Sequence, residues 1–235
     1  MLEEKAALQI QRFFASYLSK KQAIAQEAIS TSPSSKLLCA FDLRFQCMRA
    51  VAAAKFPINK PIEDPAQVIR VIASIRDLAG KKGIANLDAI ERLFHQSILL
   101  AERIQAPYYH TIWKKTYPAG IDSRRLIDHA YKQLCTVIRS FDLPIARGDA
   151  EKIDIESADV LGLARDIIQH ASKAIVGMLA EPRPLLDEVA RVEFAKDFEK
   201  MLAKYMTPKN RLRSKEDVQI LAKEVQMCGS IRSRL

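Results

Sequence analysis

The sequence predicts an all-α protein, and three observations support this fold class. Hydrophobic residues make up 49% of the 235 residues, which is enough for a substantial buried core. Only seven glycines occur, whereas residues of high helix propensity such as Ala, Leu, Lys, Glu and Gln are abundant. Runs of β-branched residues, which favour strands, are few. We therefore expect helices almost throughout, and we detect no internal repeat.

The helices in the first half of the chain are bounded by turn residues and prolines. An amphipathic helix is predicted over residues 2 to 29, and the Ser-rich segment 30 to 35 should break it. The next helix should run from about residue 36 and stop at Pro57, which lacks an amide hydrogen and restricts the preceding residue. Asp64 suits an N-cap and Pro65 a first helical position, so a third helix should extend to about residue 81.

The remaining helices follow from the same signals. A helix that starts near residue 87 should end before Pro107, and a connector should follow it. The segment TPKN should break the chain again near residue 208. Further helices are predicted at residues 122 to 141, 156 to 180, 183 to 206 and 214 to 227.

Composition and charge exclude several functional classes. The net charge of +9 and the isoelectric point near 9.4 indicate a basic surface, but no zinc-type spacing, helix-turn-helix signature or basic–aromatic repeat predicts nucleic-acid binding. The four histidines are not spaced as metal ligands, and we expect neither a metal nor another cofactor. The four cysteines are scattered in apolar contexts, which favours buried free thiols.

We also expect no membrane span, because no apolar run approaches ~18 residues. The beginning, MLEEKAALQIQRFF, has acids where a signal peptide has basic residues. The expected location is the cytoplasm, or outside the cell after export by a route that needs no signal peptide.

One stretch carries the strongest chemical signal. Arg44 and Lys55 lie eleven residues apart, about three helical turns, so both cations should emerge from one face of one helix. The residues between them on that face are mostly apolar. Because an unpaired buried charge is costly, two cations on a core-facing surface require an anion. The sequence therefore predicts an anion pocket inside a helix bundle.

This stretch resembles the all-helical chorismate mutases, and most closely the secreted subclass in which one chain carries a whole active site. The similar pieces are the Arg44 to Lys55 spacing, VAAAKF, the PIED turn at 61 to 64, and RLFHQSILLAERIQ at 92 to 105. The WKK at 113 to 115 matches as well. The resemblance covers residues 41 to 112 and continues more weakly to about Leu179.

The resemblance implies roles for individual residues. Arg44 would bind a substrate carboxylate, Lys55 would serve both the ether oxygen and a carboxylate, and Gln105 would face the ether oxygen. Asp64 would cap the next helix near the substrate hydroxyl. The reaction converts chorismate to prephenate without cofactor or nucleophile, so it needs positioning and preorganised electrostatics.

Three positions depart from the family pattern. Gln67 stands where the family has an arginine, Val71 where the subclass has a polar residue, and Ala101 where Ser or Thr is usual. Arg70, Lys132 or Arg139 could compensate. The candidate substrate-binding residues are accordingly Asp64, Gln67, Arg70, Glu102 and Lys132.

The N-terminal segment IQRFFASYLSKK resembles the IQ motif of calmodulin-binding helices, although Ala15-Ser16 replaces the usual Arg-Gly. The apolar side of such a helix enters a groove of the partner while its cations meet an acidic rim. A helix that simply packs on the bundle would have the same pattern. The candidate calmodulin-binding residues are Ile10, Gln11, Phe14, Tyr17, Leu18 and Lys20.

Two functional hypotheses follow. In the first, the chain is a chorismate mutase with a weakened active site, which would bind chorismate or a similar small dianion. In the second, it is an inactive interaction protein, such as a translocated effector, that binds calmodulin. Both place an IQ-like helix at residues 1 to 30, a mutase-like helical domain at 36 to 179 and a helical extension at 180 to 235.

Overall fold

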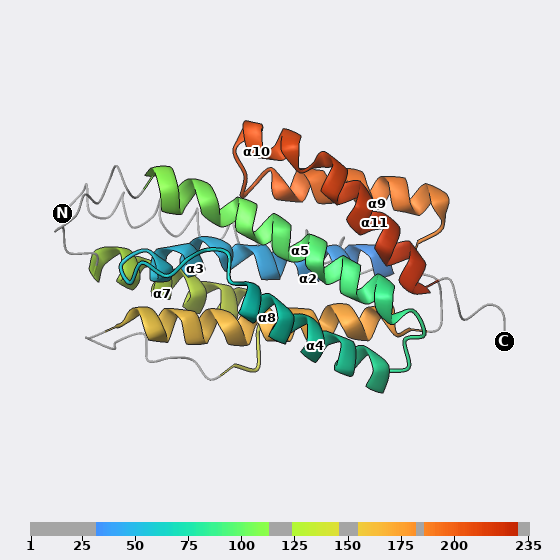
Figure 1. The fold of residues 1–235 in the computed structure, drawn as a ribbon, viewed down its shortest axis with the longest axis horizontal. Helices are drawn as coiled ribbons and strands as arrows, with labels where there is room; N and C mark the ends of the chain where they lie inside the picture. The colour runs from blue at the N-terminus through green and yellow to red at the C-terminus, as the bar shows by residue number, and fades with distance from the viewer. Residues whose placement is uncertain (1–31, 113–123, 146–154, 182–185, 230–235) are drawn as a thin grey trace, which may run out of the picture.

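The computed structural model describes residues 32–112, 124–145, 155–181 and 186–229 (Figure 1). Every regular element within these ranges is a helix, which confirms the all-α prediction. The IQ-like segment lies outside the described residues, so the predicted helix over residues 2 to 29 stays a prediction.

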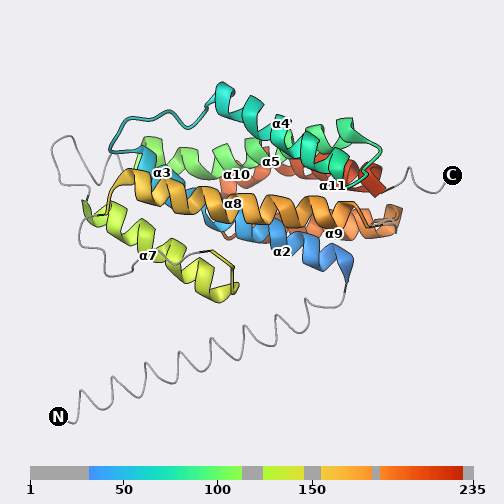
Figure 2. The ribbon, with the colours of Figure 1, turned by 90° about the horizontal axis from the view of Figure 1, so that it is seen from below.

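A central rod runs through the molecule and is formed by two consecutive helices, α2 (Pro33–Gln46) and α3 (Met48–Lys55). Four helices pack around it, as the two perpendicular views show (Figures 1 and 2). They are α5 (Leu87–Pro107), α7 (Arg124–Ser140), α8 (Ser157–Leu179) and α9 (Glu188–Leu202). Residues of the rod are therefore enclosed by helices from the whole length of the described chain.

The rod begins earlier than the sequence predicted. The Ser32 hydroxyl accepts a hydrogen bond from the amide of Ser35 at 3.1 Å, and Pro33 occupies the first helical position. The segment 30 to 35 was expected to be a break, but its Ser-Pro pair is an N-terminal capping signal. By contrast, α4 (Pro65–Lys81) has the predicted bounds, and the Asp64 carboxylate caps it by accepting from the amide of Gln67 at 2.9 Å.

The predicted end of α5 before Pro107 is wrong. The helix includes Pro107 and continues into a π-helix, η1 (Tyr108–Ile112). Proline cannot donate to the carbonyl four residues earlier, which belongs to Arg103. That carbonyl instead accepts a hydrogen bond from the side-chain amide of Asn210 at 3.1 Å. A distant residue thus satisfies the acceptor that the proline leaves open.

The helices after residue 186 pack on the first half of the chain. α9 lies against α2, and α11 (Lys215–Gly229) lies along α5 (Figure 1). The Phe198 ring meets the rings of Phe41 and Phe45 edge-on, with centroids 5.2 and 6.0 Å apart. The predicted break at TPKN contains a short helix, α10 (Pro208–Arg213), because Thr207 caps it and Pro208 fits its first turn.

Buried apolar residues from the long helices form one core cluster, to which the short helix α10 contributes none. Among the described helices, none has both the length and the apolar character that crossing a membrane would require.

Candidate functional site

Arg44 lies in the core of the bundle, where its side chain is almost completely shielded from solvent. The residue is 5% exposed, and its guanidinium lies 5.9 Å from the centroid of the Phe94 ring on α5. One terminal nitrogen, Nη1, donates to the hydroxyl of Ser172 on α8 at 3.0 Å. The rod and two of its neighbouring helices therefore converge on this cation.

No carboxylate of the described residues forms an ion pair with Arg44, and its Nε atom is buried without a hydrogen-bond partner. Burial lowers the pKa of the guanidinium to about 10, and nearby Cys47 opposes this shift. The group therefore remains charged at neutral pH. A buried cation with unsatisfied hydrogen-bonding capacity is energetically unfavourable unless an anion joins it.

Ser172 is a functional candidate that the sequence analysis did not identify. Its hydroxyl accepts from Arg44 and donates to the carbonyl of Ile168 at 2.7 Å, so its orientation is fixed. In the sequence it is only one small polar residue among the buried apolar residues of α8. Its relation to Arg44, 128 positions earlier, depends on tertiary packing alone.

Gln105 is the second buried polar group near the rod. Its side-chain nitrogen donates to the sulfur of Met48 at 3.5 Å and to the carbonyl of Ala101 at 3.3 Å. Its Oε1 atom is buried without a partner. Since Met48 follows Arg44 by about one turn, Gln105 faces the rod between the Arg44 and Lys55 positions.

Lys55 lies at the end of the rod and is half-buried. Its ammonium group donates to the carbonyl of Ile62 at 2.8 Å, in the loop that leads to Asp64. Desolvation lowers the pKa of Lys55, Lys60 lowers it further, and the carboxylates of Asp64 and Glu102 oppose both effects. Lys55, Asp64 and Glu102 are thus close enough to interact electrostatically.

The pKa of Glu102 is raised, whereas that of Lys55 is lowered. Desolvation and the neighbouring carboxylate of Glu63 raise its pKa, and Lys55 partly offsets this increase. The cationic end of Lys55 therefore lies in a mixed-charge environment, whereas Arg44 has only neutral neighbours among the groups that contact it.

The other candidates lie on the surface. Gln67 is exposed, and its Oε1 accepts a hydrogen bond from Arg70 at 2.8 Å. Lys132 is exposed on α7 and pairs with Asp128 at 2.8 Å, and Arg139 is exposed as well. The structure therefore groups Arg44 with Ser172, Gln105 with Met48, and Lys55 with Asp64 and Glu102, while Gln67, Arg70 and Lys132 make only local contacts.

These side chains combine positive charge with hydrogen-bond donors, which are the groups that recognise anions. Arg44 offers charge and an unused donor, Lys55 offers a second charge, and Gln105 offers an amide that can switch partners. No group of His, Cys, Asp and Glu among the described residues is suited to hold a metal ion. No family model, curated protein or solved structure matches this chain.

Proposed function

We propose that this chain is a chorismate mutase-like protein that binds chorismate or a similar small dianion inside its helical bundle and rearranges chorismate to prephenate through a weakened active site. The observation that carries the proposal is the buried Arg44 guanidinium, which has no carboxylate partner among the described residues. A substrate carboxylate would supply the missing negative charge and accept from Nε.

The proposed chemistry requires no covalent step on the protein. Arg44 holds one carboxylate, while Lys55 and the Gln105 amide donate to the ether oxygen, where negative charge grows in the transition state. Glutamine can donate at any pH, whereas a carboxylic acid would first need a proton. When substrate binds, the Gln105 amide would give up its weak hydrogen bonds to the Met48 sulfur and to the Ala101 carbonyl of its own helix, and it would donate to the substrate instead.

The weakness of the proposed site has a local cause. Gln67 is exposed and stands where the family has an arginine. Arg70, which was a candidate to replace that arginine, donates a hydrogen bond to the Gln67 side chain. A missing carboxylate donor in a preorganised site lowers the rate by about 10²- to 10³-fold. We therefore expect slow turnover.

The test is the loss of chorismate absorbance on adding the purified full chain. We expect slow turnover by wild type, none by Lys55→Ala, and faster turnover by Gln67→Arg. Lys81→Ala serves as the control because Lys81 is exposed and pairs with Asp77 on its own helix. Absence of turnover at high protein concentration in wild type and Gln67→Arg alike would reject the enzyme.

We propose calmodulin binding as a second function, based on Ile10-Gln11 followed by Tyr17-Leu18 and Lys20. Titrating a peptide of residues 4 to 26 with calmodulin, with and without calcium, tests it. Binding that is lost on Ile10→Asp would support the proposal. No binding at micromolar concentration would end it.

A further inference from the structure

A dense group of cations surrounds α10. No acidic residue occurs between Lys200 and Lys215, whereas six basic residues do. Lys200 pairs with Asp197, and Lys204 pairs with the half-buried Asp42. The other four are exposed and form no ion pair with a described residue: Lys209, Arg211, Arg213 and Lys215.

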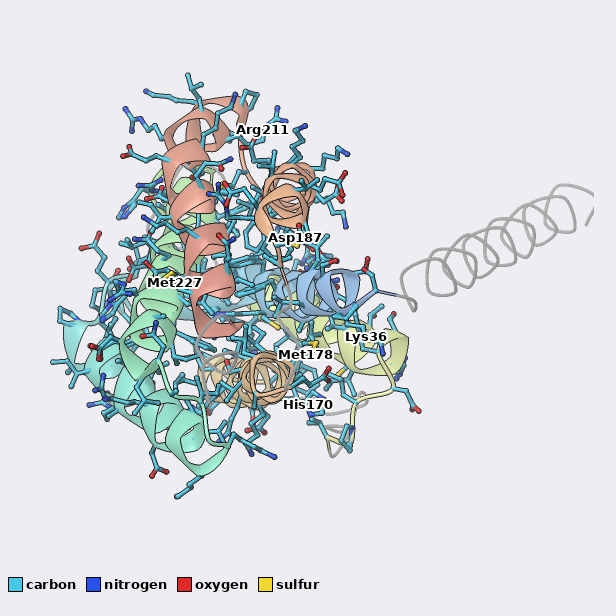
Figure 3. The ribbon with its side chains drawn as sticks, turned by 90° about the vertical axis from the view of Figure 1, so that its right-hand side faces the viewer. Lys36, His170, Met178, Asp187, Arg211 and Met227 are labelled. Atoms are coloured by element: carbon cyan, nitrogen blue, oxygen red, sulfur yellow. The ribbon has the colours of Figure 1, made fainter. Side chains whose placement is uncertain are left out.

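An exposed apolar side chain lies among these cations. Leu212 is 69% exposed and lies between Arg211 and Arg213 in the sequence. Arg211, beside it in sequence, lies at the outer edge of the molecule, at the end away from α4 and α8 (Figure 3). We call Lys209, Arg211, Leu212, Arg213 and Lys215 the basic tip.

The base of the tip is fixed to α5. The Arg103 guanidinium donates to the carbonyl of Arg213 at 2.8 Å and to the Ser214 hydroxyl at 3.2 Å, and it also pairs with Asp217. Ser214 is 1% exposed. Because the backbone beneath the cations is anchored at several points, the tip presents its charges in a fixed arrangement.

A hollow of about 210 Å³ adjoins the tip. Arg211 on α10 and Lys215 at the start of α11 line it together with Leu212 and the carboxylate-bearing Glu199. It has the size for a phosphate headgroup, and two cations flank it.

We propose that the basic tip docks this protein on a membrane surface that contains anionic lipids. Cations attract the negatively charged headgroups, and a protruding leucine can enter the boundary with the acyl chains. Nucleic acid fits the tip less well, because no aromatic residue is available there for stacking on bases. An acidic protein would satisfy the cations but offers no general reason for Leu212 to protrude.

Vesicle co-sedimentation of the full chain tests the proposal. The vesicles contain phosphatidylcholine alone, or equal parts of phosphatidylcholine and phosphatidylserine. We expect binding only to the mixed vesicles, with affinity that falls as salt increases. Replacing Lys209, Arg211, Arg213 and Lys215 together by Gln should weaken binding more than about fiftyfold, since each cation near an anionic surface contributes substantially.

A charge-matched control uses four exposed cations elsewhere: Lys81, Lys82, Arg165 and Lys173, all changed to Gln. It has the same net charge as the tip variant, so it should retain nearly full binding if position matters. For the apolar part, Leu212→Ser should weaken binding about tenfold. Ile69→Ser is the control for it, because Ile69 on α4 is 70% exposed.

Thermal unfolding establishes that each variant is folded before its binding is compared. Equal losses of vesicle binding in the tip variant and in the charge-matched control would overturn the proposal. So would failure of wild type to bind the mixed vesicles, or binding to a DNA duplex without binding to vesicles.

Discussion

Two regions of this molecule hold arginines that join helices, and they differ in burial and in what surrounds the guanidinium. At the junction of α5 with the C-terminal helices, Arg103 meets Asp217, and Arg92 makes two hydrogen bonds of 3.0 Å to the carboxylate of Glu224. In the core, Arg44 meets a hydroxyl and an aromatic ring. The first arrangement pairs each cation with a carboxylate, whereas the second leaves a buried cation with no carboxylate partner among the described residues.

The junction should give the largest effect on stability. Asp217→Ala leaves Arg103 without its carboxylate and should reduce the free energy of unfolding by about 2 kcal/mol, because the remaining cation is partly shielded and unpaired. Thermal unfolding measures this. Asp197→Ala, which breaks an exposed pair with Lys200, should change stability by less than about 0.5 kcal/mol. Similar losses in both variants would show that the junction is not specially stabilising.

Arg44→Met in the core should increase stability, whereas Asp217→Ala at the junction should decrease it. Burial lowers the pKa of Arg44 from 12.5 to about 10, which corresponds to about 3 kcal/mol of unfavourable energy for the charged form. This cost is present at all pH values below the folded pKa and disappears only at higher pH.

After subtracting the lost bond to Ser172, we expect Arg44→Met to raise the free energy of unfolding by about 1 to 2 kcal/mol. Binding of a small dianion, measured by calorimetry, should weaken by more than about tenfold. Arg92→Met is the matched substitution at the junction, and there stability should fall. A loss of stability in Arg44→Met would assign Arg44 a structural role.

Two buried serines allow a comparison that shows how much the hydrogen bond from Arg44 contributes to the free energy of unfolding. Ser172 and Ser97 each donate to a carbonyl of their own helix, but only Ser172 also accepts from Arg44. Ser172→Ala should therefore cost about 1 kcal/mol more than Ser97→Ala in thermal unfolding. Equal costs would mean that the bond to Arg44 contributes nothing.

The smallest expected effect is a change with pH in the affinity for a dianion, caused by Glu102 near Lys55. Because the pKa of Glu102 is raised above its ordinary value of 4.5, this side chain is neutral at low pH and gains its charge as pH rises through that pKa. The new charge lies near Lys55 and should repel a dianion, so affinity should fall about threefold. Glu102→Gln should flatten the profile, and Glu91→Gln on the exposed side of α5 should leave it unchanged.

Local signals in the sequence predicted much of the fold. The Asp64-Pro65 pair defines the start of α4 because both the cap and the proline act within one turn. The continuation of α5 through Pro107 could not be predicted in the same way, since it coincides with a hydrogen bond from Asn210 to the Arg103 carbonyl.

In the candidate site, too, contacts between residues far apart in the sequence could not be predicted. The spacing of Arg44 and Lys55 indicated a cationic helix face, but the Ser172 partner of Arg44 comes from a helix far along the chain. Lys132 was a candidate because its register was open, and it lies exposed beside Asp128. Residue type alone does not determine which side of α7 faces the rod.

The Asn210 contact has a consequence for synthesis on the ribosome. Asn210 follows Arg103 by 107 positions. At about 5 to 20 residues per second, roughly 5 to 20 s pass between their incorporation. During this interval the Arg103 carbonyl lacks its final donor, and the rings of Phe41 and Phe45 lack Phe198. We therefore expect the nascent chain to expose an incomplete core until its last helices have left the ribosome.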